Sequence, residues 1–497
     1  MISFALLSAL VVAAPGEVAP TTAAAASAVK PEQLKTMMRN MHRVGEAQAQ
    51  VAQPVPIKSS WGRRAVSLLG IGVMIVLALL LSDNRRSVPW RLVGLGCALQ
   101  LVFGLLVLKT DVGSSLFGMV NDLVNGLLAF TTEGSRFLFG NLVTNNVPVG
   151  SPLGDPSMGP IIEPNQTGWA GVGAYFAFGV LPTLIFFSSI TAVGYHLGFL
   201  QRVVGAVAWV MRRTLRTSGP ESLSAAGNIF LGQTESPLLI KPYVQRMTDS
   251  ELMAVMVGGF ATVAGGVMLA FVGMLSGYFP NIAGHLIAAS VMSAPAALVM
   301  AKIMVPETQD ASHEGDVETH DDSEAVNVID AAARGAGEGL KLALNVGAML
   351  IAFVALVALV NAIFAWVGGF IGFPGLSMEW LLGRLLAPLA WVMGVDWADA
   401  AFCGSQLGVK TVTNEFVAFL NVAGNLGSEG AISGRSAVIL TYALCGFANF
   451  SSIAIQIGGI GSIAPQRRSD LARLGLRAMI AGNLAAYMTA CVVGILL

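Results

Sequence analysis

Apolar segments of membrane-spanning length recur along most of the chain and alternate with short polar turns. The longest of them cover residues 65–82, 92–108, 171–199, 251–277, 282–304, 340–367, 436–461 and 471–497. A helix needs about 20 apolar residues to cross the hydrocarbon core of a bilayer. A water-soluble core could not bury all of these segments, because it would need a polar shell around it. The pattern therefore predicts an all-α polytopic membrane protein.

The segment 221–246 departs from this pattern, because a polar turn separates two short apolar arms. Gln233, Thr234 and Glu235 form the turn, and Pro237 prevents a regular helix from continuing across it. At about 1.5 Å per helical residue, each arm is long enough to reach the middle of a bilayer and turn back. Non-helical backbone at that depth occurs only where it is buried in protein or lines a cavity. We therefore expect a re-entrant helical hairpin with a polar tip.

The segment 397–428 has the same form in the second half of the chain. Its polar turn consists of Thr413, Asn414 and Glu415. Both hairpins would thus carry a carboxylate near the membrane midplane, where a charged side chain is costly and calls for a functional explanation. In the alternative interpretation both glutamates lie in water-exposed loops, which leaves the apolar arms on either side unexplained.

The apolar span that follows each hairpin is also interrupted. Thr262 stands among glycines in residues 258–267, and Asn449 and Ser452 stand in the middle of the span that contains residues 446–453. Unwound backbone at such positions exposes carbonyl groups and the ends of half-helices. Close helix packing through small residues is an alternative for the glycines, but it does not account for Asn449.

The order of elements is the same in residues 171–304 and 329–497. Each part has an apolar span, an amphipathic stretch, a hairpin segment, an interrupted span and a final span. Two broken segments in corresponding positions are typical of the inverted repeats of secondary transporters, whose substrate site lies between them. The acidic segment 305–328 would be a solvated linker between the repeats. Residues 61–170 would add two N-terminal helices, an interfacial helix and a loop.

Amphipathic or polar-interrupted stretches lie between several of the spans. We expect an interfacial or re-entrant helix at residues 111–130 and interfacial helices at residues 200–216 and 377–393. Residues 145–168 are rich in proline and glycine and should form an exposed loop.

The N-terminal region contains no full span. Residues 1–14 include a short apolar stretch that ends in small residues, as in a candidate signal peptide. Residues 15–60 have no sustained apolar face and should form a flexible arm. Arg85, Arg86 and Arg91 favour a cytoplasmic position for the turn after the first span. The basic residues of the arm favour the opposite orientation, and export of the arm by a signal peptide would resolve this conflict.

Composition narrows the class of function. The chain is 55% hydrophobic and 11% charged, with a mean hydropathy of +0.71, whereas soluble domains carry about 25% charged residues. A net charge of −1 gives no basic surface for nucleic acid. The four cysteines lack metal-ligand spacing and are expected to be buried thiols.

Other classes of membrane protein fit less well. The spans contain no GxSxG, HExxH or paired aspartates, so an intramembrane hydrolase would lack its nucleophile and base. A channel would need a polar stripe along a continuous pore, whereas the polar residues cluster at two tips and two breaks. A dicarboxylate carrier would need arginine at the site, and both tips lack it. The residues alone favour a transporter of a small polar solute.

Three motifs are similar to those of a known family. The chain contains GNIFLGQTESPLLIKPY, TNEFVAF and ALCGFANFSSIAIQIGGIGSIAPQRR, which resemble segments of the concentrative nucleoside transporters. The resemblance extends from about residue 65 to the C-terminus. It implies eight transmembrane helices, two re-entrant hairpins, interfacial helices and a homotrimer with one site in each protomer.

The resemblance also implies a function. The protein would be a symporter in the bacterial inner membrane that imports nucleosides with sodium, needs no cofactor and performs no enzymatic reaction. Proton coupling is the alternative, and transport of another small polar solute is a less favoured one.

The residues of the substrate site follow from the same resemblance. Those assigned to the nucleobase are Gln233, Thr234, Glu235 and Val267. Those assigned to the ribose are Glu415, Phe447, Asn449 and Ser452. A carboxylate can accept two hydrogen bonds from a vicinal diol, and amide and hydroxyl groups suit the donors and acceptors of a base edge.

The family's sodium site corresponds to four further positions. They are the side chains of Asn228 and Thr262 and the backbone carbonyl groups of Leu231 and Val263. Broken helices of transporters coordinate sodium with such neutral oxygens. The set contains no titrating carboxylate, and the resemblance implies that proton-driven members tend to lose it. Its presence here favours sodium over protons as the coupling ion.

Overall fold

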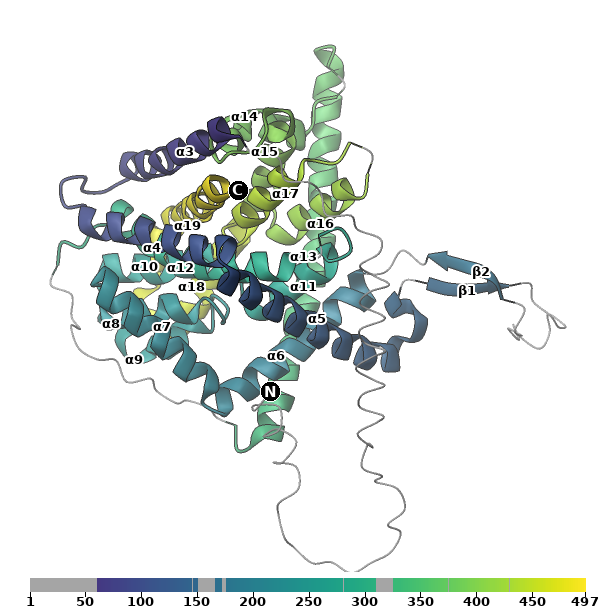
Figure 1. Ribbon diagram of the computed structural model, residues 1–497, viewed down its shortest axis with the longest axis horizontal. Coiled ribbons are helices and arrows are strands. Elements are labelled where there is room, and N and C mark those ends of the chain that lie inside the picture. The colour runs from purple at the N-terminus through teal and green to yellow at the C-terminus, as the bar shows by residue number, and fades with distance from the viewer. Residues whose placement is uncertain are drawn as a thin grey trace, which may run out of the picture. The chain divides into compact units, whose positions relative to one another are not determined.

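The computed structural model describes residues 60–144, 146–150, 166–171, 176–279, 281–309, 325–373, 375–428 and 430–497. The candidate signal peptide at 1–14 and nearly all of the arm at 15–60 lie outside the described residues. So does most of the acidic linker at 305–328. The described residues belong to one compact unit, and they are almost entirely helical (Figure 1). The predicted all-α membrane architecture is confirmed.

The first elements are three α-helices, a short 3-10 helix and two short strands. They are α3 (Trp61–Leu80), α4 (Trp90–Lys109), α5 (Asp111–Phe139), η1 (Gly140–Thr144), β1 (Asn146–Gly150) and β2 (Gln166–Gly171). Helix α5 contains the predicted interfacial stretch 111–130 but continues to Phe139. The strands pair antiparallel, with Asn146 opposite Gly171, where the sequence predicts only loop. Pro148 is compatible with this pairing because both strands of a two-stranded sheet are edge strands.

The next helices belong to the first predicted repeat, residues 171–304. Its elements are the π-helical turn η3 (Phe176–Val180), α6 (Leu181–His196), α7 (Phe199–Leu215), α8 (Gly219–Gly227), η4 (Ser236–Ile240), α9 (Lys241–Val244), α10 (Asp249–Ala261), α11 (Gly265–Leu275) and α12 (Ile282–Met304).

The helices of the second repeat come in a similar order: a long span, an interfacial helix, a hairpin, two half-helices and a final span. They are α13 (Val328–Phe370), α14 (Met378–Val392), α15 (Trp397–Val412), α16 (Glu415–Leu426), α17 (Gly434–Leu444), α18 (Phe450–Ile463), η5 (Pro465–Arg467) and α19 (Arg468–Leu496). Hairpin 1 is therefore α8, η4 and α9 with the turn between α8 and η4, and hairpin 2 is α15 and α16.

Among the described residues, seven helical stretches are long and apolar enough to cross a membrane. They are Trp61–Leu80, Trp90–Lys109, Phe176–His196, Asp249–Leu275, Ile282–Met304, Val328–Phe370 and Pro465–Leu496. The remaining predicted span, 436–461, corresponds to α17 and α18, which are shorter because residues 445–449 interrupt them. The chain bends by 116° between α14 and α15, as expected where an interfacial helix leads into a hairpin.

Local capping residues define where the broken helices begin. Capping boxes formed by Ser218 with Glu221 and by Thr248 with Glu251 start α8 and α10. The side chains of Asn414 and Asn449 accept hydrogen bonds from backbone N–H groups of α16 and α18. A cap satisfies N–H groups that have no partner within the helix. Asn414 at the hairpin 2 tip and Asn449 at the second break therefore also start the helices that follow them.

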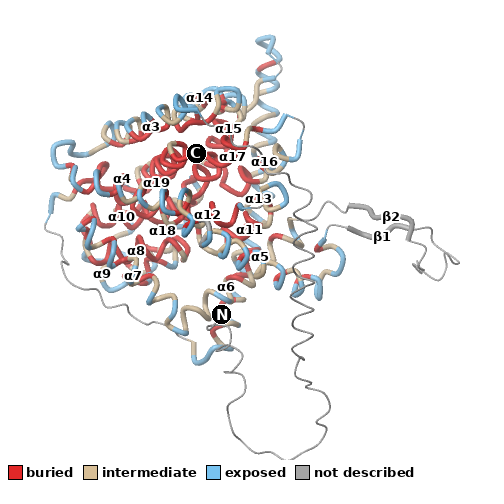
Figure 2. The backbone as a smooth tube through the Cα atoms, viewed as in Figure 1, coloured by how far each residue is buried: buried red, intermediate tan, exposed pale blue. Residues whose placement is uncertain are grey.

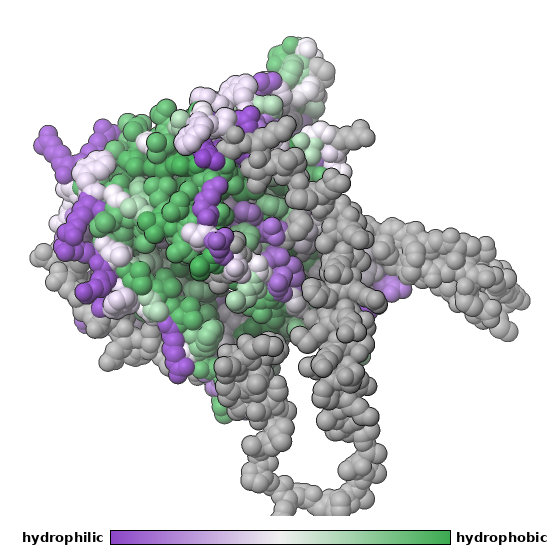
Figure 3. Space-filling view, in the orientation of Figure 1, coloured by the Kyte–Doolittle hydropathy of each residue, from purple (hydrophilic) through white to green (hydrophobic). Residues whose placement is uncertain are grey.

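Helices α10, α12 and α19 form the centre of the unit (Figure 2). In α12, 89% of the apolar stretch is buried, whereas in α13 only 6% is buried. Hydrophobic side chains cover much of the coloured surface in Figure 3, while hydrophilic ones gather along its left edge and in smaller groups near the middle. A hydrophobic exterior of this kind is stable in contact with lipid or with another apolar protein surface.

Helices α6 and α13, the first spans of the two repeats, pack directly against each other. Added Cβ atoms at Gly335 and Gly339 would lie 2.6 Å from Ser188 O and from Ile185 Cα. The Ser189 hydroxyl donates to Ala332 O at 2.9 Å. Small residues four apart allow such close approach of membrane helices.

Charged residues join several helix ends at one side of the unit. Arg477 of α19 pairs with Asp83 of the α3–α4 turn at 2.6 Å, and the Asp83 N–H donates to Met304 O at the end of α12. Arg467 pairs with Asp249 at the start of α10 at 3.2 Å. These ion pairs and hydrogen bonds join α19 and the turn before it to the ends of α10 and α12 and to the α3–α4 turn.

Candidate functional site

The two hairpins approach each other through a chain of hydrogen bonds that runs along the start of α18. Gln233 Nε2 of hairpin 1 donates to Ser452 Oγ at 3.2 Å. The Ser452 N–H donates to Asn449 Oδ1 at 2.9 Å, and Asn449 Nδ2 donates to Glu415 Oε2 of hairpin 2 at 2.9 Å. All four side chains are buried. Residues predicted for the base and for the ribose are thus brought together.

Hairpin 1 presents its other two predicted residues differently. Glu235 is exposed, and its Oε2 accepts a hydrogen bond from the Gly232 N–H at 3.2 Å. Thr234 packs on α18, since a Cβ atom at Gly459 would lie 2.8 Å from Thr234 Cγ2. Only Glu415 of the two tip carboxylates is therefore buried, whereas the sequence pattern predicts similar positions for both.

The breaks in the two interrupted spans lie against each other. Gly446 has a φ of +128°, and a Cβ atom there would lie 2.7 Å from Phe260 O and 2.9 Å from Ala261 O. Asn483 of α19 donates to Ala448 O at 3.0 Å. Glycine is required where backbones approach this closely in a left-handed conformation. The site is consequently built where two unwound backbones cross.

Val267 and Phe447 lie at this crossing as buried side chains, Val267 in α11 and Phe447 within the α17–α18 break. Helix α11 also contacts hairpin 2 through aromatic rings. The Phe271 ring centroid is 4.9 Å from that of Phe416 and 4.4 Å from that of Phe419. Such contacts hold the second arm of hairpin 2 against the first repeat.

The four residues predicted for sodium lie in the hairpin 1 turn after α8 and in the break between α10 and α11. Asn228 is buried, and neither polar atom of its side chain has a hydrogen-bond partner among the described residues. The Thr262 hydroxyl bonds to Gly258 O at 2.8 Å, and a Cβ atom at Gly258 would lie 3.0 Å from Asn228 Nδ2. The carbonyl oxygens of Leu231 and Val263 accept no hydrogen bond within the described part of the chain.

This oxygen set suits a monovalent cation. A buried amide without partners is costly, and an ion is one way to satisfy it. The Phe230 carbonyl accepts from the Gly265 N–H at 3.1 Å, which fixes the turn against the break between α10 and α11. A metal site made of His, Cys, Asp or Glu is a different possibility, but no group of three or more such side chains in the described ranges is arranged to hold a metal ion.

Two residues that the sequence analysis did not single out support the site. Gln456 Nε2 donates to Gln233 Oε1 at 3.1 Å and to Met256 O at 3.1 Å. Lys410 is fully buried and donates to Ala443 O at 3.0 Å, near the end of α17, where a cation is favourable because helix C-termini carry partial negative charge. Gln456 lies four residues after Ser452, so helical periodicity could have placed it on the same face.

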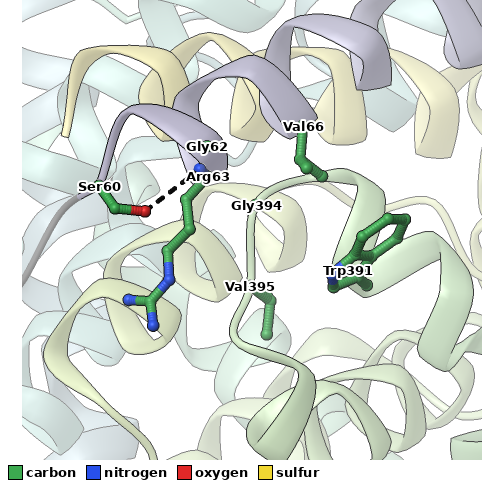
Figure 4. A pocket seen from close by; sticks show the side chains of 7 residues that line it. All are labelled: Ser60, Gly62, Arg63, Val66, Trp391, Gly394 and Val395. Carbon is green, nitrogen blue, oxygen red and sulfur yellow. Dashed lines mark hydrogen bonds between the residues drawn. The ribbon is translucent and has the colours of Figure 1, made fainter.

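Two cavities are lined by residues outside this chain of hydrogen bonds. One, of about 260 Å³, is lined by Ser60, Gly62, Arg63, Val66, Trp391, Gly394 and Val395 (Figure 4). There Arg63 pairs with Asp396 at 2.9 Å. The other, also about 260 Å³, is mostly apolar and reaches the hairpin 1 turn at Ile229 and Phe230. None of the residues predicted for the nucleoside or for sodium lines either cavity.

Three family models match the chain. The model of the C-terminus of Na+ dependent nucleoside transporters matches residues 285–494, and that of their N-terminus matches residues 69–142. A nucleoside recognition model, named Gate, matches residues 177–278. Together they cover most of the described chain.

Similar proteins are transporters. An uncharacterised transporter of Haemophilus influenzae is 44% identical over 86% of this chain and 97% of its own length. The sodium/nucleoside cotransporter 1 of Mus musculus is 41% identical over 87% of this chain and 63% of its own length.

Solved structures of CNTnw are similar to this chain. The structure of CNTnw in an inward-facing, substrate-bound state is 41% identical, with a TM-score of 0.76 over 87% of this chain and 97% of that one. A double variant of CNTnw in an outward-facing state has a TM-score of 0.75 and 40% identity, over 87% of this chain and 97% of that one. The chain therefore belongs to the family of Na+ dependent, or concentrative, nucleoside transporters, whose members are transporters and not enzymes.

Proposed function

We propose that this protein is a sodium:nucleoside symporter that imports nucleosides across the bacterial inner membrane by alternating access. The observation that carries the proposal is the buried chain from Gln233 through Ser452 and Asn449 to Glu415. It unites an amide suited to a base with a carboxylate suited to a vicinal diol.

The nucleoside would lie between the hairpin tips. Glu415, Asn449 and Ser452 would bind the ribose hydroxyl groups, with Phe447 beside the sugar. Gln233 and Thr234 would bind the base, Val267 would pack against it, and Glu235 would reach it from the exposed side of the tip. Hydrogen bonds to the substrate would then replace the contacts that these buried groups make with one another.

Sodium would bind at Asn228, Thr262 and the carbonyl groups of Leu231 and Val263. The buried Asn228 amide, which has no hydrogen-bond partner in the part of the chain that the structure describes, supports this position. Because the Asn228 and Gln233 positions belong to one turn, sodium would order the turn before the nucleoside arrives. The neutral oxygen set favours sodium over a proton, and an inward membrane potential of 100 mV adds about 2.3 kcal/mol per charge.

Movement and assembly complete the proposal. The hairpins and broken helices would move against a scaffold that includes α6 and α13, which pack through Gly335 and Gly339. The exposed apolar surface of α13 would face lipid and the other protomers of a homotrimer.

Transport in reconstituted vesicles tests the proposal. Labelled uridine or adenosine should accumulate inside when an inward sodium gradient is imposed at constant pH. Accumulation driven equally well by a proton gradient without sodium would support proton coupling instead. Purified protein should also gain thermal stability from a nucleoside in sodium but not in potassium, and glutamate should have no effect. Absence of both responses would refute the proposal.

A further inference from the structure

We propose that Gln456 is a positioning residue that fixes the orientation of the Gln233 amide, so that a hydrogen-bond donor faces the nucleobase. The site would therefore favour nucleosides whose base carries an oxo group over those that carry an amino group at the same ring position. This role presupposes the nucleoside site proposed above and adds to it a determinant of base selectivity.

The orientation follows from a backbone carbonyl group. Met256 O can only accept a hydrogen bond, so the Gln456 atom at 3.1 Å from it must be Nε2. The same Nε2 lies 3.1 Å from the Gln233 side chain. Since Nε2 donates, the Gln233 atom on that side must be the acceptor Oε1. Gln233 Nε2 is thereby turned the other way, toward Ser452 Oγ at 3.2 Å.

Close packing leaves the two amides little freedom to turn. Gln456 is fully buried and Gln233 is 8% exposed. Both lie on the backbone of α10 at Gly259, where an added Cβ atom would be 2.8 Å from Gln456 Nε2 and 2.9 Å from Gln233 Cβ. A side chain at position 259 would clash with both glutamines, so glycine is needed there for the two amides to contact each other.

The remaining hydrogen-bonding capacity points to the kind of base. Both N–H groups of Gln456 Nε2 are used, by Met256 and by Gln233. Gln233 Nε2 points toward Ser452, so the N–H groups on that side of the amide are the donors that Gln233 would offer a substrate. An N–H group matches the oxo oxygen of uridine or inosine, whereas the amino group of cytidine or adenosine would oppose one donor with another.

The test compares binding within the pairs uridine and cytidine, and inosine and adenosine. It uses full-length protein in saturating sodium and whichever pair binds. The unaltered protein should bind the oxo member more tightly. In Gln456→Leu, which no longer fixes the amide, the oxo-to-amino ratio of affinities should fall by about 2- to 10-fold, the contribution of one hydrogen bond.

Gln456→Glu should lower the oxo-to-amino ratio of affinities more than Gln456→Leu does. Its carboxylate cannot donate, so the Gln233 amide would turn its nitrogen toward position 456 and its oxygen toward the base. The matched control is Gln406→Leu, which removes another buried amide, one bonded to Ser405 and Asn421. The control should leave the ratio as it is in the unaltered protein.

The outcomes separate the two proposals. A ratio that stays constant in both Gln456 variants, or no oxo preference in the unaltered protein, would overturn the role of Gln456 and leave the nucleoside site standing. The preference of the unaltered protein can be read even when a variant does not fold. Failure of the unaltered protein to bind any of the four nucleosides would overturn the proposed function itself.

Discussion

At the scale of residues, the two tip carboxylates occupy unlike environments. Glu415 is buried and accepts a hydrogen bond from Asn449, whereas Glu235 is exposed and accepts a hydrogen bond from Gly232 of its own turn. A buried carboxylate needs donors to offset its desolvation. Glu415 would gain such donors from a ribose, and so it is the better choice for a first substitution.

Replacing Glu415 by Gln should abolish nucleoside uptake. The change keeps the shape of the side chain but removes the charge that would bind the diol, which should lower nucleoside affinity by about 10- to 100-fold. Uptake of labelled uridine and nucleoside binding by purified protein would measure the loss.

A comparable pair elsewhere provides the control. Glu379 accepts hydrogen bonds from Asn361 at 2.9 and 3.2 Å, away from the hairpin tips. Glu379→Gln should transport normally. Normal uptake by Glu415→Gln would refute the assignment of that residue to the ribose.

Replacing Asn228 by Ala should raise the sodium concentration required for half-maximal uptake by about 10-fold, because one neutral oxygen ligand is lost. Nucleoside affinity at saturating sodium should change much less. Sodium titrations of uptake give both values. Asn421→Ala, which removes a side chain bonded to Gln406, should leave the sodium dependence unchanged. An Asn228→Ala protein with the original dependence would place the ion at other residues.

At the scale of elements, the interrupted spans are maintained by caps at their starts and by glycine at their closest approach. Asn449 starts α18, and Gly446 allows the preceding backbone to contact α10. Both features are local in sequence, and for this reason the breaks could be predicted. Their consequence is long-range, because they bring two unwound backbones together.

Replacing Gly446 by Ala should destabilise the protein by about 1–3 kcal/mol, the cost of a left-handed conformation in a residue with a side chain. The new methyl group would also contact Phe260 O and Ala261 O. Thermal unfolding in detergent would show a lower midpoint temperature. The rise in that midpoint on adding a nucleoside should also become smaller. Gly458→Ala lies in the same span with open space around it and should be tolerated. Equal midpoints for the two variants would contradict the proposed constraint.

At the scale of the whole molecule, a buried charge cluster joins hairpin 1 to the central helices. Lys302 of α12 pairs with Glu221 at the start of α8 and donates to the Ser250 hydroxyl at 2.9 Å. It also lies 3.6 Å from Glu307, which accepts a hydrogen bond from Thr248. The cluster anchors one end of hairpin 1 and leaves the tip to respond to ligands.

Replacing Lys302 by Met should destabilise the protein by about 3–5 kcal/mol, because Glu221 would remain as a buried charge without its partner. The double variant with Glu221→Gln should recover part of this loss. Thermal unfolding midpoints measure both effects. Lys341→Met removes a lysine from an exposed pair with Glu338 and should leave the midpoint nearly unchanged. A Lys302→Met protein as stable as the unaltered one would show that the cluster does not anchor the hairpin.

Much of this architecture can be predicted from short segments of the sequence. Apolar length, polar tips, caps and glycines each depend on a few neighbouring residues, so the repeat order and the hairpins are predictable. The strand pair at 146–150 and 166–171 was missed because its pairing depends on backbone hydrogen bonds rather than on an apolar pattern.

The sequence by itself determined that the chain crosses a membrane, where its helices break and which polar residues lie at the breaks. Tertiary structure alone decided which of those residues meet. Gln233 contacts Ser452 and Gln456 across separations of 219 and 223 residues, and Glu415 is buried while Glu235 is not. The physical reason is that a hydrogen bond depends on the position and direction of both partners, which the packing of distant helices sets and no local pattern records.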